Sequence, residues 1–325
     1  MSRYLITGGC GSIGSEIARQ LVARGDSVMV LDNLSGGSLD NITDVADSVH
    51  VTIDDVQHVS RLRALVEQAD FVLHLAASLG VRNVIENPVP TMFNNLESTR
   101  LALEVASEFR RPVLVASTSE VYGLSDRLPF REDDPITLGA SSVMRWQYAT
   151  CKFADEFMAL AYMQERGLPV VVTRFFNAVG PAQNDKYGFV VGRFVRQALA
   201  NEPITIFGDG NQSRCFCDCR DTALASIKLM DAKAWGEVVN IGTTNEVTIG
   251  DLARLVKERT GSKSPIQYVS YSQAYGTGYQ DMSRRVPDVS KLKRLTGFAP
   301  NAHLFETIDR MAEHLRNEVV AVEVM

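Results

Sequence analysis

A glycine-rich segment near the N-terminus places the strongest constraint on how this 325-residue chain can fold. Gly8, Gly11 and Gly14 have the spacing GxxGxxG, and they stand between an apolar stretch at residues 3–7 and a stretch with helical apolar spacing at residues 12–24. Glycines at such a junction permit a tight turn and let the backbone approach a pyrophosphate at the helix N-terminus. The segment therefore predicts a strand, turn and helix that bind a dinucleotide.

Short β-branched stretches alternate with longer helical stretches through the first half of the chain. Because parallel strands need crossover connections, this alternation predicts an α/β fold with a Rossmann-type, doubly wound parallel sheet. The predicted strands cover residues 3–7, 27–31, 71–74, 112–116 and 170–174, and the clearest helices cover residues 12–24 and 98–109.

The pattern loosens after Arg174, where loops rich in Gly, Pro and Asn mix with helices. We therefore expect an NAD-binding Rossmann domain over residues 1–176 and a smaller, mainly substrate-binding domain over residues 177–325. Residues 238–241 again have the pattern of a buried strand, so a segment near 215–245 is expected to return to the first domain. Residues 301–318 have the spacing of a packing helix.

Charge and hydropathy exclude several classes of function. The formal net charge is −6 without a run of Lys or Arg, so a nucleic-acid partner is not expected. A hydrophobic content of 45% with 22% charged residues is typical of a soluble globular protein, and no membrane association is expected. The first residues lead directly into a strand pattern rather than a signal peptide, which favours a cytoplasmic location.

The five cysteines are an odd number without CxxC spacing, which argues against a disulfide framework and against a zinc knuckle. Cys215, Cys217 and Cys219 alternate, as they would on one face of a strand. Buried cysteines are ordinary small hydrophobic residues, however, and this spacing differs from that of zinc sites. We predict free thiols and no metal.

The end of the second predicted strand carries a further cofactor signal. Asp32 follows the glycines by about 20 residues, and a carboxylate there can accept both ribose hydroxyls while repelling a 2′-phosphate. NAD is therefore favoured over NADP, and the alternative is that Asp32 is only a solvated loop residue. Near the end of the third strand, Asp55 and Val56 are candidate adenine contacts.

Tyr148 and Lys152 stand four residues apart and hence on one face of a helix. A free tyrosine has a pKa of about 10, and a neighbouring ammonium can lower it into the range of a working base. Most such pairs arise by chance, but residues 117–123 (STSEVYG) directly follow a predicted strand. They therefore lie at the carboxyl edge of the sheet, where ligands bind in this architecture. Together the two segments predict an active site with Tyr148 as the base.

With these motifs, the chain resembles the extended short-chain dehydrogenases/reductases of the NAD-dependent epimerase/dehydratase family, which act on nucleotide sugars. The resemblance covers nearly the whole chain and rests on TGGCGSIG (7–14), HLAA (74–77), STSEVYG (117–123), YATCK (148–152) and RFFNAVGP (174–181). It implies a homodimer formed by helices near 98–109 and 148–164. It also implies NAD contacts from Ser12, Ile13, Asn33, Leu75, Ala76, Ala77, Tyr148 and Lys152.

Within that family, the first of four segments resembles the pattern of UDP-glucuronate decarboxylases and also that of GDP-mannose 4,6-dehydratases. The other three resemble the decarboxylase of the bacterial aminoarabinose pathway and the plant UDP-apiose/UDP-xylose synthases, which act on UDP-glucuronate. Simple 4-epimerases usually lack the glutamate that matches Glu120. Cys217 and Cys219 are a departure, because those relatives usually carry other residues there, and this bears on the fine specificity. The four segments cover residues 118–120, 145–148, 214–216 and 274–287.

The resemblance implies how the sugar would be oxidised. Tyr148 would take the proton of the 4-hydroxyl, Thr118 would hold that hydroxyl, and Lys152 would bind the nicotinamide ribose. The expected reaction is loss of carbon dioxide from UDP-glucuronate after oxidation at C4, which gives a UDP-4-ketopentose or UDP-xylose.

The resemblance also assigns residues to the substrate. Arg285 would orient the substrate carboxylate, and Ser119 and Glu120 would manage the proton returned to C5. Alternatively, Arg285 anchors the start of a helix and Glu120 is a structural hydrogen-bond acceptor. The remaining predicted substrate contacts are Asn177, Arg214 and Tyr279.

Three other functions stay open at this point. A nucleotide-sugar 4-epimerase would use the same Thr118, Tyr148, Lys152 and NAD, and Glu120 and Arg285 would distinguish the two enzymes. A 4,6-dehydratase is less favoured, since a serine stands where dTDP-glucose dehydratases have an aspartate. A non-catalytic NAD-binding regulator is disfavoured by the presence of every catalytic residue type.

Overall fold

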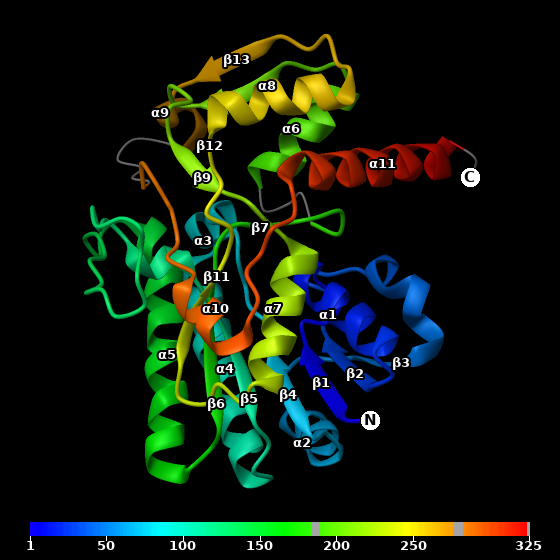
Figure 1. Cartoon of the computed structure of the whole chain (residues 1–325), viewed down its shortest axis with the longest axis vertical. Coiled ribbons are helices and arrows are strands. Elements are labelled where there is room, and N and C mark those ends of the chain that lie inside the picture. The colour runs from blue at the N-terminus through cyan, green and yellow to red at the C-terminus, as the bar shows by residue number, and fades with distance from the viewer. Residues whose placement is uncertain (184–188, 276–281, 324–325) are drawn as a thin grey trace.

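A seven-stranded parallel sheet runs through the larger lobe of the computed structural model, which describes residues 1–183, 189–275 and 282–323 (Figure 1). The strand order is β11-β6-β5-β4-β1-β2-β3, and every neighbouring pair is parallel. This arrangement confirms the predicted α/β fold with a doubly wound parallel sheet. The strands are β1 (Arg3–Thr7), β2 (Ser27–Asp32), β3 (Val49–Ile53), β4 (Phe71–His74), β5 (Val113–Thr118), β6 (Val170–Phe175) and β11 (Val238–Ile241).

The strands end close to the predicted positions, and the differences matter at the carboxyl edge. β1 and β4 have the predicted bounds, whereas β2, β5 and β6 each continue one or two residues further. Asp32 and Thr118 are therefore the last residues of their strands, and not loop residues beyond them. The strand order reverses between β1 and β4, which is where ligands bind in open α/β sheets.

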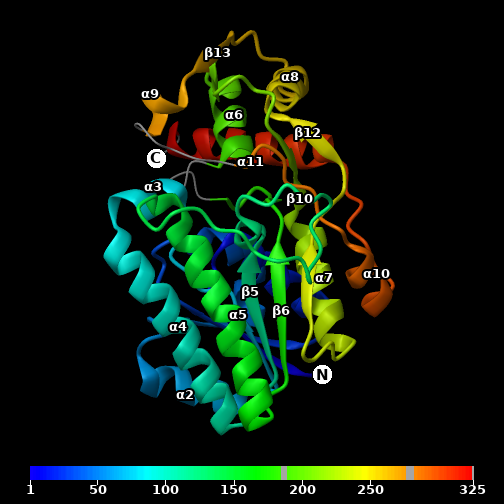
Figure 2. The ribbon, with the colours of Figure 1, turned by 90° about the vertical axis from the view of Figure 1, so that its left-hand side faces the viewer.

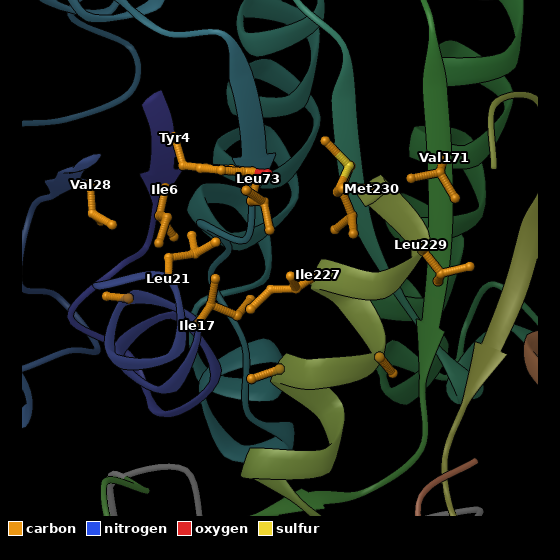
Figure 3. Close-up of a cluster of buried hydrophobic side chains, with 14 of the residues drawn as sticks. Tyr4, Ile6, Ile17, Leu21, Val28, Leu73, Val171, Ile227, Leu229 and Met230 are labelled. Carbon is orange, nitrogen blue, oxygen red and sulfur yellow. The ribbon is translucent and has the colours of Figure 1, made fainter. Parts of the chain in front are cut away.

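One face of the sheet packs against α1 (Ser12–Ala23) and α7 (Cys219–Asp231). Successive side chains of a strand point to opposite faces, so Tyr4 and Ile6 of β1 belong to this face while Leu5 does not. Figure 3 shows how the side chains of the strands meet those of the two helices. The labelled residues are Tyr4, Ile6, Ile17, Leu21, Val28, Leu73, Val171, Ile227, Leu229 and Met230.

The opposite face is covered by three helices, of which α4 and α5 lie side by side (Figure 2). They are α2 (Val59–Gln68), α4 (Pro88–Glu108) and α5 (Gln147–Arg166). The predicted helix at 98–109 in fact begins at Pro88, because a proline fits the first turn of a helix, where its missing N–H has no partner to lose. The buried side of this longer helix faces Leu5, Leu31 and Val115 of the sheet.

The smaller lobe has a separate apolar core, to which Phe194, Ile206, Leu252 and Ile308 belong. Its helices are α6 (Val190–Leu199), α8 (Ile249–Thr260) and α11 (Leu304–Glu323). Three two-stranded sheets join them: β8 (Ile204–Phe207) with β13 (Ile266–Val269), β9 (Ser213–Cys215) with β12 (Glu246–Thr248), and β7 (Ala178–Val179) with β10 (Cys217–Asp218).

Short elements connect the two lobes. Between β6 and α8 the chain passes to the small lobe, returns with α7 and β11 to the large sheet, and leaves again. α10 then packs against α7 and β11. The short helices are α3 (Val81–Glu86), α9 (Tyr271–Tyr275), α10 (Ser290–Thr296), and the 3-10 helices η1 (Leu39–Ser48), η2 (Ser119–Tyr122) and η3 (Met144–Trp146).

The expectation of one strand face bearing three cysteines is wrong. Cys215 ends β9, Cys217 lies in β10, and Cys219 begins α7. The helix starts there because the side chain of Asp218 accepts a hydrogen bond from the Arg220 amide at 2.8 Å and caps its first turn. All five cysteines are buried and free, as predicted. None of the helices over the described residues combines the length and apolar character needed to cross a membrane.

Candidate active site

A cleft of about 1070 Å³ opens over the carboxyl edge of the large sheet and reaches under the small lobe. Its floor is formed by the glycine-rich turn and the ends of β2, β4 and β5, and its roof includes residues of α6, β8 and β9. Every predicted site residue that the structure describes lines this cleft. Tyr279 lies outside the described residues.

The glycine-rich turn leaves no room for side chains on its inner side. Gly8 has φ +74°, in the left-handed region, and a Cβ there would lie 2.8 Å from the amide nitrogen of Ala76. A Cβ on Gly14 would overlap the carbonyl oxygen of Gly8. The Gly11 amide donates to the Gly8 carbonyl at 3.2 Å and closes the turn. The first residues of α1 line the cleft. This geometry fits a pyrophosphate.

Asp32 is buried and tied to the turn, which argues against a solvated loop residue. One of its oxygens accepts the Cys10 amide at 2.9 Å, and the other accepts the Leu34 amide at 2.8 Å. A carboxylate has about four acceptor positions, so both oxygens keep capacity for ribose hydroxyls. Asn33 donates to Asp55 at 2.7 Å, which links two further predicted cofactor contacts at the ends of β2 and β3.

Tyr148 lies near the start of α5, with Lys152 one turn further along the same helix. Burial raises the pKa of Tyr148, and the carboxylates of Glu120 and Asp155 raise it further. The expected lowering by Lys152 is therefore not found. The main reason is burial, and the ion pair of 3.1 Å between the Lys152 Nζ and Asp155 adds to it, since this carboxylate offsets the ammonium charge near the phenol.

Glu120 is held by two arginines in the buried part of the cleft. The Arg145 Nη1 lies 2.6 Å from one of its oxygens, and the Arg285 Nη1 lies 3.7 Å from the other. Burial would raise the pKa of the Glu120 carboxyl, but the charges of Arg145 and Arg285 outweigh it and hold the pKa below its usual value. Glu120 is therefore a carboxylate near neutral pH, and it is suited to accept a proton but not to donate one.

Arg285 does not anchor a helix, because the next helix, α10, begins only at Ser290. Its guanidinium is buried and donates to Ser119 at 3.4 Å and to Asn177 at 3.3 Å. The backbone beside it is fixed by a hydrogen bond of 2.8 Å from the Phe130 amide to the Val286 carbonyl. Arg285 thus reaches the cleft from an extended segment that pairs with the large lobe.

Three arginines act on the carboxylate of Glu120. One carboxylate faces the guanidinium groups of Arg145 and Arg285, and Arg214 also acts on it electrostatically. All three arginines line the cleft and are buried. Buried guanidinium groups in the lining of a cleft suit a substrate that carries a negative group.

Several cleft residues of the small lobe were not predicted from the sequence. Arg193 lies over the ring of Phe207, with 3.9 Å between the guanidinium carbon and the ring centroid. Phe189 and Tyr271 add two more aromatic rings to the same lining. They come from α6, β8, α9 and the loops between them, and no sequence motif marks them, because only the packing of the small lobe brings them together.

Comparisons with known proteins agree with this arrangement. A family model described as the NAD dependent epimerase/dehydratase family matches residues 4–242. A UDP-N-acetyl-alpha-D-glucosaminuronate decarboxylase from Bacillus cytotoxicus is 39% identical over 300 residues, which are 92% of this chain and 93% of that protein. A UDP-glucuronic acid decarboxylase from Xenopus tropicalis is 33% identical over 322 residues, 98% of this chain and 73% of the relative.

A solved structure gives the same result at the level of the fold. The UDP-glucose 4-epimerase of Thermus thermophilus, solved as a complex with NAD, superposes with a TM-score of 0.83 and 28% identity. The match covers 97% of this chain and 99% of the epimerase. Both lobes of the structure are therefore included in the similarity.

The close contact at Gly14 predicts the effect of a single methyl group. Gly14→Ala should weaken NAD binding by at least about tenfold, because the new Cβ displaces the Gly8 carbonyl and distorts the turn. Gly250→Ala in α8 is the matched control, since its Cβ would lie 3.4 Å from the nearest oxygen and cause no overlap. Calorimetric titration with NAD checks both variants. Equal affinities for Gly14→Ala and the wild type would contradict the assignment of the turn.

Proposed function

The chain belongs to the NAD dependent epimerase/dehydratase family, and we propose that it decarboxylates a UDP-hexuronate after oxidising C4 of the sugar. The observation that carries this proposal is that two buried arginines, Arg145 and Arg285, line the same cleft as Tyr148. UDP-glucuronate is the first candidate substrate. The B. cytotoxicus relative adds its 2-acetamido counterpart as the second.

The residues of the cleft fit NAD as the resident cofactor. The glycine-rich turn would hold the pyrophosphate, Asp32 the adenine ribose, and Lys152 the nicotinamide ribose. The adenine would lie near Asp55 and Val56, and the alanines after β4 would leave space beside the glycines. Bound NAD accepts the hydride from C4 and, in its oxidised form, brings a positive charge that favours the phenolate of Tyr148.

Oxidation depends on two hydroxyl groups at the edge of the sheet. Tyr148 takes the proton of the 4-hydroxyl as the C4–H bond is broken, and Thr118 hydrogen-bonds the same oxygen. Thr118 ends β5 and caps η2, where its side chain accepts the Glu120 amide at 3.3 Å. Its own hydroxyl hydrogen therefore remains available to the substrate. The product of this step is a 4-ketone.

Decarboxylation follows from the position of the carboxylate, which is now β to the ketone. The C5–C6 bond breaks, carbon dioxide leaves, and the electron pair moves into the C4 carbonyl as an enolate. Tyr148 and Thr118 stabilise its oxygen by hydrogen bonds. Arg145 and Arg285 would orient the carboxylate before it leaves, in a site whose low polarity strengthens such contacts.

After carbon dioxide has left, C5 needs a proton, and two residues of the cleft, Glu120 and Ser119, are candidates to deliver it. Glu120 is ionised, so it can accept and relay a proton but does not start with one. Ser119 is buried beside Arg285, and its hydroxyl would hold a water or pass a proton to C5. The 4-ketopentose is then released, or it regains hydride at C4 and becomes UDP-xylose.

A 4-epimerase is the second candidate, and the similarity to known 4-epimerases supports it. An epimerase of neutral sugars would have no carboxylate for Arg145 and Arg285 to bind. The two buried guanidinium groups therefore favour decarboxylation over it. A UDP-glucuronate 4-epimerase would also bind the substrate carboxylate with Arg145 and Arg285. Only the reaction product distinguishes such an epimerase from a decarboxylase.

We also propose the two-domain division and the cytoplasmic location. The packing of α7 and β11 on the large sheet supports assigning residues 215–245 to the NAD-binding domain, and the separate core of the small lobe supports a substrate-binding domain in the remainder of 177–325. Five buried, free cysteines suit a reducing compartment.

A homodimer is proposed on the outer faces of α4 and α5. The two helices run parallel, since Gln147 donates to the Pro88 carbonyl at one end and Tyr162 donates to Glu104 at 2.5 Å near the other. Phe93 of α4 is 66% exposed and Phe157 of α5 is 63% exposed, which is unusual for phenylalanine. A second copy of the same pair would bury both rings.

The substrate assignment is tested by incubating the purified protein and NAD with UDP-glucuronate, and separately with its 2-acetamido counterpart. We expect loss of carbon dioxide by mass spectrometry, and proton NMR of the product will show whether the 4-ketone is released or reduced. An unchanged mass with appearance of UDP-galacturonate would instead establish the epimerase. If neither hexuronate reacts, neutral UDP-hexoses are the next substrates, and the decarboxylase proposal is wrong.

Arg285→Gln should slow decarboxylation by about 100-fold, because the substrate carboxylate loses a charged partner in a buried site. Oxidation at C4, followed as NADH absorbance in a single turnover, should fall much less. Arg284→Gln is the control, because this neighbouring guanidinium is exposed and pairs with Glu246 at 2.7 Å. Equal losses in both steps would argue against a role specific to the carboxylate.

The double variant Phe93→Glu/Phe157→Glu should be monomeric, because four charges would face one another in the proposed interface. Sedimentation equilibrium of the wild type and the variant measures this. Tyr268→Glu, which changes an equally exposed ring of β13, should keep the wild-type mass. A monomeric wild type would contradict the dimer itself.

A further inference from the structure

A buried acidic residue, which the proposed mechanism does not use, contacts the predicted catalytic lysine. We infer that Asp155 is a positioning residue that holds the Lys152 ammonium for the cofactor ribose and sets the basicity of the Tyr148 phenol. The kinetic part of this inference rests on the proposed function, whereas the cofactor-binding part does not.

Lys152 and Asp155 form an ion pair that is closed off from solvent. The Nζ lies 3.1 Å from Oδ2, and the two side chains are 3% and 0% exposed. An ammonium carries three N–H donors, so the contact with Asp155 leaves donors for two ribose hydroxyls. Without this carboxylate the buried ammonium would be free to turn among its rotamers. The pair therefore fixes the lysine at the floor of the cleft.

A chain of polar side chains leads from Asp155 to the glycine-rich turn. Burial raises the pKa of the Asp155 carboxyl, while Lys152 and the hydroxyl of Thr99 on α4 favour its charged form. The Thr99 hydroxyl contacts the His74 Nε2 at 3.3 Å, and the Nδ1 of His74 contacts the Thr7 hydroxyl at 2.8 Å. Thr7 directly precedes Gly8. Three buried residues, Thr99, His74 and Thr7, thus connect Asp155 to the predicted pyrophosphate turn.

The direction of each hydrogen bond between Asp155 and Thr7 follows from the direction of the first one. If Thr99 directs its hydrogen toward Asp155, the His74 Nε2 must donate to Thr99, and Nδ1 must accept from Thr7. This arrangement requires a neutral imidazole, and burial lowers the pKa of His74 to about 3. The hydrogen bonds from Thr7 to Asp155 consequently keep one direction, and the imidazole of His74 stays neutral, across the pH range in which enzymes work.

One oxygen of Asp155 is left over. Oδ1 is buried and has no hydrogen-bond partner of ordinary geometry among the described residues. A buried, unsatisfied carboxylate oxygen costs free energy, so a purely structural residue would not need to be charged here. The ion pair with Lys152 offsets part of that cost, and the carboxylate of Asp155 also acts on the phenol of Tyr148.

The charged and titratable groups around the phenol allow its titration to be identified. Glu120 of η2 is ionised at neutral pH, and burial raises the pKa of the Cys151 thiol to about 11. His74 of β4 stays neutral, Glu156 of α5 is paired with Arg174, and α4 contributes only the hydroxyl of Thr99. A rise of activity with pH near neutrality would therefore report Tyr148 with the positive charge of bound NAD beside it, because burial raises the pKa of the phenol in the protein alone.

Asp155→Asn and Asp155→Ala separate charge from position. The asparagine keeps an oxygen that can accept from Lys152 but removes the negative charge, so the phenolate becomes more stable. We expect the ascending limb of kcat/KM to move about one pH unit lower, with NAD affinity close to that of the wild type. The alanine also removes the acceptor, so NAD should bind about tenfold more weakly. Asp309→Asn, on the exposed side of α11, is the control for net charge.

The measurements are pH profiles of kcat/KM and calorimetric titrations with NAD, together with thermal unfolding to show that each variant is folded. A pH profile of Asp155→Asn that coincides with the wild type would overturn the effect on Tyr148. Equal NAD affinities for both Asp155 variants and the wild type would overturn the positioning of Lys152. If the wild type acts on no UDP-sugar, the proposed function fails, and the NAD titrations alone decide this inference.

Discussion

The active-site helix depends on a buried ion pair at its middle. Glu156 of α5 accepts two bonds from Arg174 of β6, at 2.9 and 2.7 Å, and a third from Ser117 of β5 at 2.5 Å. Both charged side chains are 4% exposed, so removing either partner would leave a buried charge and cost about 3–5 kcal/mol. Because Ser117 precedes Thr118, this contact also sets the distance between the strand end and the helix.

The same helix then presents its chemistry in sequence along one side. Tyr148, Lys152 and Asp155 follow one another at helical spacing, and Glu156 fixes the turn beneath them. Burial raises the pKa of the phenol, and the carboxylates of Glu120 and Asp155 raise it further. Tyr148 is therefore a weak general base without the cofactor. The positive charge of bound, oxidised NAD would favour its phenolate, which couples the basicity of Tyr148 to cofactor binding.

Much of this could be predicted from the sequence, because the features concerned are local. The apolar runs fixed the positions of the strands, and the glycine spacing identified the turn at Gly8 to within a residue. The site residues at strand ends followed, since parallel strands end at one edge. The pKa of Tyr148 was predicted wrongly because the i,i+4 spacing shows a lysine, but neither the burial of the phenol nor the carboxylates near it. Asp155 is visible three residues later, yet the sequence alone does not show that it is buried.

Residues from distant segments were beyond prediction for a different reason. Arg193 and Phe207 meet only after the small lobe has packed, and no periodicity connects them. Arg285 was found through resemblance, and its contact with Asn177 could not be derived, because 108 residues separate the two. The side chain of Asn177 in turn donates to the Cys215 carbonyl, so it joins the two lobes as well as lining the cleft.

Cys217 and Cys219 differ from the residues that the decarboxylase relatives usually carry, and the structure shows where the two cysteines lie. Cys217 accepts a hydrogen bond from Thr222, and Cys219 lies 3.1 Å from the Ser12 hydroxyl and packs against Gly180. Neither lines the cleft beside Glu120. Their difference from the decarboxylase relatives therefore affects the packing of α7 near the dinucleotide turn. Other residues, which line the cleft, must determine the specificity for the sugar.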